Sequence, residues 1–142
     1  MSGKTTSSAR NTAILYAYVA AGGVLGSVAR YLASVFIPSV YGFPLATLFV
    51  NITGSFVIGF YNALTGPDGR LFASARQRQF VMTGLCGGYT TFSSFSLETV
   101  RLLQAGMERT ALLNIAVSVV TWLVAVWLGH MLASRLNRLT RS

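Results

Sequence analysis

The chain alternates between four apolar blocks and short polar segments. The blocks run from Ala13 to Ile37, from Leu45 to Leu64, from Phe80 to Leu103 and from Leu112 to Leu132. Each approaches the roughly 20 residues that a helix needs to cross a hydrocarbon core about 30 Å thick. The pattern predicts an all-α membrane protein with four transmembrane helices in one domain, residues 13–134. We also expect a polar segment at residues 1–12, loops at 38–44, 66–79 and 104–109, and a basic tail at 135–142.

The composition agrees with a membrane setting and argues against an enzyme. Hydrophobic residues make up 53% of the chain and charged residues 10%, whereas soluble domains carry about 25% charged residues. The chain has three acidic residues, one histidine and one cysteine, and they form no visible nucleophile–base pair or metal-ligand spacing. Cys86 has no partner for a disulfide within the chain and is interpreted as a small packing residue.

The net charge of +8 is spread over the ends of loops rather than gathered on one face. Scattered cations suit the anionic headgroups of a bilayer, so we expect a lipid partner and no nucleic acid. The side that holds both termini is the more basic and is predicted to be cytoplasmic. It carries Lys4, Arg10, Arg70, Arg76, Arg78, Arg135, Arg138 and Arg141, against Arg101, Arg109 and the nearby Arg30 on the other side.

The third block contains a segment that is poorly suited to a continuous helix. Gly87 and Gly88 precede Thr90 and Thr91, and tandem glycines weaken a helix locally. Non-helical backbone at membrane depth must face protein or a wet cavity, so the sequence predicts a helix broken at mid-membrane. A break near residues 87–90 frees carbonyl oxygens that suit a small cation such as Na⁺, and the helix that begins near Thr91 offers N–H groups to an anion. Packing alone is the alternative interpretation of the glycines.

Small residues also recur at helical spacing in the first three blocks. The pairs are Gly22 and Gly26, Ser55 and Gly59, and Gly84 and Gly88. Such pairs allow transmembrane helices to approach closely. We therefore expect contacts between helices at these positions.

Two phenylalanines follow the predicted break. Phe92 and Phe95 are three residues apart, so they share one face of the new helix. They alternate with Ser93, Ser94 and Ser96, an unusual composition for a surface that packs against lipid. Since the edge of an aromatic ring is electropositive, a phenylalanine presented edge-on could help to coordinate a dehydrated anion. Ordinary core packing is the competing interpretation.

Polar side chains follow one face of the second and fourth blocks. Thr47, Asn51 and Ser55 recur every four residues, and Asn114 and Ser118 repeat that spacing. The Asn51 amide carries two N–H donors, and burying it without a partner costs a few kcal/mol. It either donates to an ion or bonds a neighbouring helix, a common adhesive role. The sequence does not choose between the two.

Few charged residues lie inside the blocks. An arginine within a membrane span is a functional-site hypothesis by default, with backbone carbonyls or headgroups as its structural alternative partners. Arg30 could concentrate anions at a pore mouth, whereas Glu98 could pair with a cation there or line the vestibule. His130, near the basic tail, is interpreted as a polar residue at the level of the headgroups.

Three segments together resemble a known family. The strings GGYTTFSSFSLE in the third block, GGVLGSVARY in the first and VNITGSFVIGF in the second are similar to the Fluc/CrcB fluoride channels. The resemblance covers nearly the whole chain, and a GG-x-TTFS-x-FS string within a membrane span is a specific signal. It implies a passive, fluoride-selective channel of the bacterial inner membrane that exports fluoride from the cytoplasm. It also implies an antiparallel, dual-topology dimer with two pores.

The resemblance implies a role for individual residues as well. Phe92 and Phe95 would be ring-edge ligands of fluoride, and Asn51 would be the amide donor beside them. The backbone carbonyls of Gly87 and Thr90 would hold a structural Na⁺ at the dimer interface. Arg30 would lie near the aqueous vestibule. The remaining residues of the implied fluoride pathway are Thr47, Thr91, Asn114 and Ser118.

The bias of cations toward one side leaves two forms of assembly open. We expect an antiparallel homodimer, with a heterodimer formed with an oppositely oriented sister chain as the alternative. Among other functions, a proton-coupled exporter of the small multidrug resistance type would need a carboxylate in the first block, which has none between Ala13 and Ile37. A scaffold subunit would leave the aligned polar and aromatic faces without a purpose.

Overall fold

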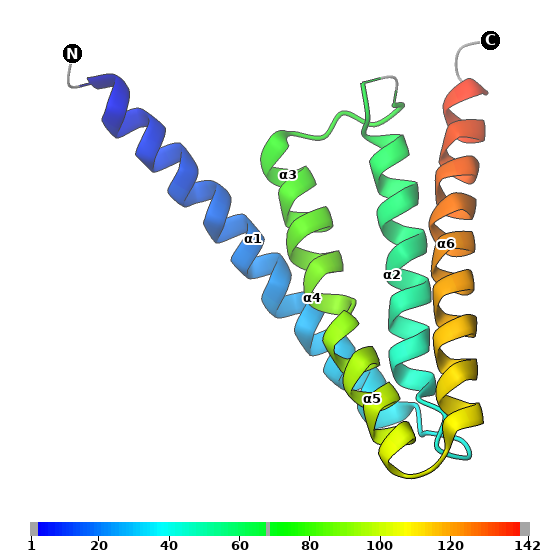
Figure 1. The fold of residues 1–142 in the computed structure, drawn as a ribbon. Helices are drawn as coiled ribbons and strands as arrows, with labels where there is room; N and C mark the ends of the chain where they lie inside the picture. The colour runs from blue at the N-terminus through cyan, green and yellow to red at the C-terminus, as the bar shows by residue number, and fades with distance from the viewer. Residues whose placement is uncertain (1–2, 68, 140–142) are drawn as a thin grey trace.

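The computed structural model describes residues 3–67 and 69–139, and every regular element in these ranges is helical (Figure 1). Most are α-helices, and one, η1, is a π-helix. In chain order they are α1 (Gly3–Phe36), α2 (Leu45–Leu64), α3 (Ala75–Gln79), η1 (Phe80–Cys86), α4 (Gly87–Tyr89), α5 (Phe92–Gln104) and α6 (Glu108–Arg138). The predicted all-α class is confirmed.

Three helices among the described residues are long and apolar enough to cross a membrane. They are α1 from Ser8 to Phe36, α2 and α6. The third apolar block differs from them because it is divided into η1, α4 and α5. No one of these pieces has the length of a span, so the segment can cross a bilayer only as a composite.

The two outer helices are longer than the sequence pattern predicts. The α1 helix begins at Gly3 rather than Ala13, and α6 runs from Glu108 to Arg138 rather than from Leu112 to Leu132. The added residues, 3–12, 108–111 and 133–138, are largely polar, and after the first residue, Gly3, they contain neither glycine nor proline that would stop a helix. Part of the predicted basic tail is helical for the same reason, whereas Arg141 lies outside the described residues.

A short helix also occupies the end of the loop predicted at residues 66–79. Ser74 begins α3 with a capping box, in which its hydroxyl accepts from Gln77 N and the Gln77 side chain accepts from Ser74 N. Arg78 then fastens α3 to the C-terminal end of α2, because its guanidinium donates to Thr65 O at 2.5 Å and to Asn62 Oδ1 at 2.9 Å. The loop therefore ends at Ser74.

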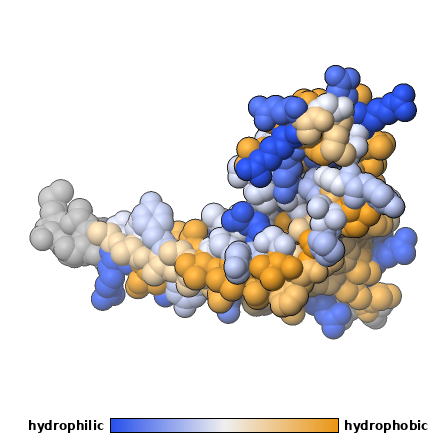
Figure 2. All heavy atoms as spheres, turned by 90° about the horizontal axis from the view of Figure 1, so that it is seen from below, coloured by the Kyte–Doolittle hydropathy of each residue, from blue (hydrophilic) through white to orange (hydrophobic). Residues whose placement is uncertain are grey.

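The helices form a bundle from which one arm diverges (Figure 1). The α2 and α6 helices lie side by side, and η1 and α4 lie between α2 and α1, while α5 packs against α6 and α2. The α1 helix packs against η1 and α4 but leaves the bundle toward its N-terminal end. Figure 2 shows this arm from below, with apolar side chains along it and over much of the body. An apolar exterior of this kind suits lipid or a second protein surface.

Glycines set the closest contacts between these helices. A methyl group at Gly22 or Gly26 would collide with the backbone of η1 and α4, and one at Gly84 or Gly88 would collide with the backbone of α1. A methyl group at Gly59 would likewise collide with the Val126 carbonyl of α6. The predicted close contacts are confirmed at these positions, including Gly88. Gly87 differs, because a methyl group there would meet no atom within 4 Å.

Candidate functional site

The chain leaves helical geometry for two residues between α4 and α5. Thr90 has φ −80° and ψ 156°, and Thr91 has φ −151° and ψ 113°, both in the extended region. Thr91 then caps α5, since its hydroxyl accepts a hydrogen bond from Ser94 N at 3.1 Å. A methyl group at Gly54 would collide with the Thr90 side chain, so only a glycine allows α2 to approach the extended pair this closely.

Asn51 of α2 holds the extended pair through two hydrogen bonds. Its Nδ2 donates to Thr91 O at 3.0 Å, and its Oδ1 accepts from Thr91 N at 2.7 Å. The amide thus replaces, with a side chain, two bonds that an uninterrupted helix would make with its own backbone. The adhesive role left open by the sequence is present, and one of the two Nδ2 hydrogens stays available for another acceptor.

Because the helix is interrupted here, two glycine carbonyls lose the donors that a continuous helix would give them. In a continuous helix Thr91 N would donate to Gly87 O, but here it donates to Asn51 Oδ1. Gly88 O accepts instead from Arg30 Nε at 3.1 Å. Arg30 thus bonds a backbone carbonyl, which the sequence left open as the alternative to a role at a pore mouth. Gly87 O has lost its helical donor, and Gly87 itself is exposed on the single chain.

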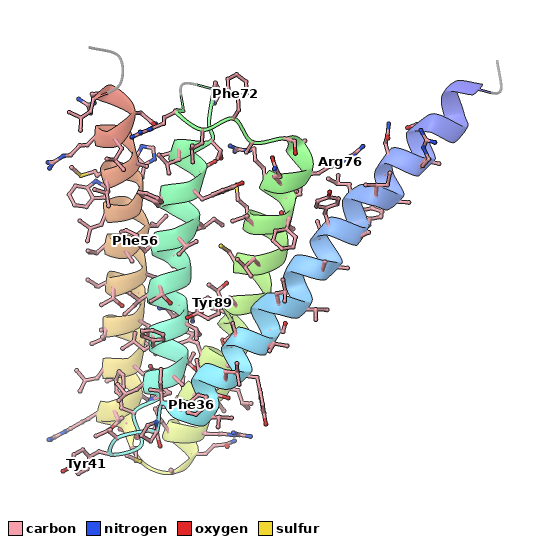
Figure 3. All side chains as sticks on the ribbon, turned by 180° about the vertical axis from the view of Figure 1, so that it is seen from behind. Phe36, Tyr41, Phe56, Phe72, Arg76 and Tyr89 are labelled. Carbon is pink, nitrogen blue, oxygen red and sulfur yellow. The ribbon has the colours of Figure 1, made fainter. Side chains whose placement is uncertain are left out.

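Three aromatic rings meet beside the break. The Phe92 and Phe95 centroids are 5.5 Å apart, and Phe95 meets Trp122 of α6 edge to face at 5.0 Å. Phe95 is 7% exposed, whereas Phe92 is 70% exposed on the surface of the single chain. On α4, Tyr89 points toward α2 (Figure 3), where its hydroxyl lies 3.0 Å from Thr53 Oγ1.

A cavity of about 280 Å³ opens beside these rings. None of its lining residues, all of which the structure describes, is charged. The lining comes from α2, η1, α4, α5, α6 and the extended pair: Asn51, Gly54, Ser55, Ile58, Met82, Cys86, Gly87, Thr90, Thr91, Phe92 and Trp122. The predicted residues Asn51, Gly87, Thr90, Thr91 and Phe92 are thus brought together.

A second cavity, of about 330 Å³, lies on the other side of Thr91. Thr91 lines both cavities, whereas Thr90 lines only the first. Arg30, Thr47 and Glu98 contribute polar and charged groups here. Thr47 Oγ1 donates to Glu98 Oε1 at 2.8 Å, while Oε2 is buried and has no hydrogen-bond partner among the described residues. The predicted vestibule residues therefore share one space.

Asn114 and Ser118 are brought to a different place. Both are buried between α5 and α6, and neither lines the two cavities. Asn114 Nδ2 donates to Thr99 Oγ1 at 2.9 Å, and Ser118 Oγ donates to Asn114 Oδ1 at 3.4 Å. In the single chain Asn114 thus ties α6 to α5, while Ser118 bonds Asn114 within α6.

The sequence interpretation missed Trp122. It lines the first cavity and touches Phe95. Its position was nevertheless available, because it follows Ser118 by four residues and Asn114 by eight. This is the spacing at which a helix repeats one face.

These features define an all-helical membrane protein with two cavities beside an interruption between helices. A family model described as "CrcB-like protein, Camphor Resistance (CrcB)" matches residues 17–130, and the chain belongs to this family. The resemblance found in the sequence is thereby confirmed.

Several relatives match almost end to end. The chain is 67% identical over 132 residues to the "Fluoride-specific ion channel FluC 1" of Rhodopseudomonas palustris (strain BisB18), which covers 92% of this chain and 94% of the relative. It is 62% identical over 131 residues to the protein of the same name from Bradyrhizobium diazoefficiens, with 92% of each covered. It is also 54% identical over 124 residues to the "Fluoride-specific ion channel FluC" of Rhodospirillum rubrum, covering 86% of this chain and 96% of that relative.

Proposed function

We propose that the chain is a passive, fluoride-selective channel that releases fluoride from the cytoplasm across the bacterial inner membrane. The observation that carries this conclusion is the near-complete match to relatives named fluoride-specific ion channels. The uncharged cavity at the helix break supports it. Fluoride must exchange its water for donors that bind weakly enough to let it leave, and neutral amides, hydroxyls and ring edges meet both demands.

Each part of the pathway has a distinct task in this proposal. Phe92 and Phe95 present ring edges to the ion, and the free Nδ2 hydrogen of Asn51 donates to it beside them. Thr91, shared by both cavities, connects this space to the vestibule. There Arg30 raises the local anion concentration and Thr47 contributes a hydroxyl. Asn114 and Ser118 extend the polar track along α6, from their buried position behind Phe95 and Thr99.

The membrane arrangement completes the proposal for the single chain. Four spans cross the bilayer: α1, α2, α6 and the composite of α3, η1, α4 and α5, which is interrupted at mid-membrane. The loop after α2 and the end of α6 lie together, since Arg70 N donates to Asn137 Oδ1 at 3.1 Å and Asn137 Nδ2 donates to Ala63 O at 2.9 Å. That end gathers most of the arginines, so it faces the cytoplasm in a chain that obeys the positive-inside rule.

The proposed assembly is an antiparallel dimer with dual topology. The diverging arm of α1 supports it, because large apolar side chains along α1 are exposed in the single chain and suit a second copy (Figure 1). Phe92 and Gly87 are exposed on the single chain, so a partner packed there would enclose the cavity at the break. A homodimer is the form we propose, with a heterodimer of oppositely oriented sister chains as the alternative raised by the charge bias.

A structural Na⁺ at the interface of that dimer is the last element of the proposal. Hard cations of this kind bind backbone oxygens, and a bound cation raises the local potential for anions. Gly87 O fits the role because its helical donor is engaged by Asn51, and Thr90 ends the helix in extended geometry. The two carbonyls of each subunit would hold the ion between the subunits.

A proton-coupled exporter gains no support. Between Ala13 and Ile37 the chain has no acidic residue to exchange protons, and the relatives are named as channels.

The decisive experiment measures ion release from liposomes. Purified protein is reconstituted into vesicles loaded with potassium fluoride and potassium chloride, and valinomycin is added to balance charge while ion-selective electrodes follow both anions. We expect rapid fluoride release, no chloride release above that of protein-free vesicles, and no effect of a protonophore. Equal release of the two anions, or release of neither, would overturn the function.

A further inference from the structure

One buried donor beside the break has no partner. The indole Nε1 of Trp122 is buried and forms no hydrogen bond with the residues in ranges 3–67 and 69–139. An indole nitrogen can only donate, and a buried tryptophan usually places this N–H against an acceptor. Because leaving such a donor unpaired destabilises a fold, this one indicates a ligand or partner that the single chain does not supply.

The groups around Trp122 indicate which class of ligand could accept its N–H. The ring lines the same uncharged cavity as Asn51 and Phe92, and it meets Phe95 edge to face. Thr91 O, a nearby backbone acceptor, is already engaged by Asn51. Gly87 O, which also belongs to the lining, is the acceptor that the proposed function assigns to a cation. The second Asn51 Nδ2 hydrogen, the ring edges and the indole N–H carry positive potential, and these groups suit an anion.

We propose that Trp122 donates its indole N–H to the permeating fluoride ion beside Phe95 and thereby belongs to the ion's ligand set. The assignment rests on the proposed channel function and adds to it a residue of α6. Trp122 continues the face of Asn114 and Ser118 at intervals of four residues, so the polar track ends on an aromatic donor. The Trp122 side chain lines the cavity, and its Nε1 is buried in the single chain.

The chain offers a direct test because it contains two tryptophans, Trp122 and Trp127. Full-length protein labelled with ¹⁵N-tryptophan and reconstituted in nanodiscs should show two indole N–H signals, which the Trp127→Phe variant assigns. Sodium fluoride is titrated against sodium chloride at equal ionic strength. The Trp122 signal should shift with fluoride and not with chloride, and the Trp127 signal, from a side chain 56% exposed, should shift with neither. A Trp122 signal that stays fixed in protein that conducts fluoride would overturn the assignment.

Flux through variants supplies the second readout. Trp122→Phe keeps an aromatic ring and removes the N–H, so fluoride release should fall at least about tenfold, while Trp127→Phe should match the unsubstituted protein. Release from Trp122→Phe within about twofold of the unsubstituted protein would also overturn the assignment. If Trp122→Phe does not assemble, the titration of the unsubstituted protein decides. A failure of the channel function itself appears separately, as an unsubstituted protein that releases no fluoride.

Discussion

Replacing Asn51 with aspartate tests how the cavity treats charge. The new carboxylate can still accept the hydrogen bond from Thr91 N, which Asn51 Oδ1 now accepts at 2.7 Å. It cannot reproduce the bond from Nδ2 to Thr91 O, and it places a second oxygen against that carbonyl. The substitution is nearly isosteric, so the main change is a negative charge in the ion's path and one lost donor.

The size of the effect follows from Coulomb's law. For an anion that passes about 4 Å from the carboxylate, with an effective dielectric constant of about 20, the repulsion is about 4 kcal/mol. Each 1.36 kcal/mol added to a barrier lowers a rate about tenfold. Fluoride release should therefore fall by roughly three orders of magnitude, which a liposome assay would register as a block.

The assay needs a control for the chemical change itself. Asn62 lies on the same helix, but its Oδ1 accepts from Arg78 Nη2 at 2.9 Å and it lines neither cavity. Asn62→Asp should therefore conduct like the unsubstituted protein in the same electrode measurement. Normal fluoride release through Asn51→Asp, in protein whose dimer assembles, would remove Asn51 from the pathway.

Two further substitutions test the ring edge and the glycine contacts. Phe92→Ile removes a ring from the cavity at a site that is 70% exposed in the single chain, so fluoride release should be lost while size-exclusion chromatography shows normal assembly. Release within about twofold of the unsubstituted protein would contradict the role of Phe92. Gly26→Ala drives a methyl group into the Leu85 carbonyl oxygen, and since overpacking costs about 1–3 kcal/mol, its thermal denaturation in detergent should occur at a lower temperature. Gly23→Ala, whose methyl group meets no atom within 4 Å, is the matched control, and equal denaturation temperatures would refute the packing.

The sequence was a good guide to the helices. The bilayer imposes a length on apolar segments, so α2 was located to the residue, Leu45 to Leu64. The ends of α1 and α6 were harder, because a polar segment that lacks glycine and proline can either continue a helix or end it. A break was expected near residues 87–90 because tandem glycines weaken a helix, but Gly87 and Gly88 are helical and the extended residues are Thr90 and Thr91.

The pairing of polar groups could not be read from the sequence. Asn51 and Thr91 are 40 positions apart, and Arg30 and Gly88 are 58 apart, so their bonds depend on how helices cross rather than on local pattern. Asn114 was expected in the pathway, yet in the single chain it bonds Thr99. A tryptophan such as Trp122 is easily taken for a lipid-facing side chain, because only the three-dimensional contacts reveal that its N–H has no acceptor among the described residues.

The pair of bonds between Asn51 and Thr91 restricts how position 51 can drift during evolution. Only asparagine has a side-chain amide that is short enough to present one donor and one acceptor to Thr91. Aspartate lacks the donor, and serine and threonine are too short. Glutamine places the amide one methylene further from the backbone. A leucine would leave the N–H and the C=O of Thr91 without the hydrogen bonds that Asn51 makes, at a cost of about 1–3 kcal/mol each. Mutational paths away from asparagine at this position therefore begin with a penalty, unless the interruption itself is repaired in the same step.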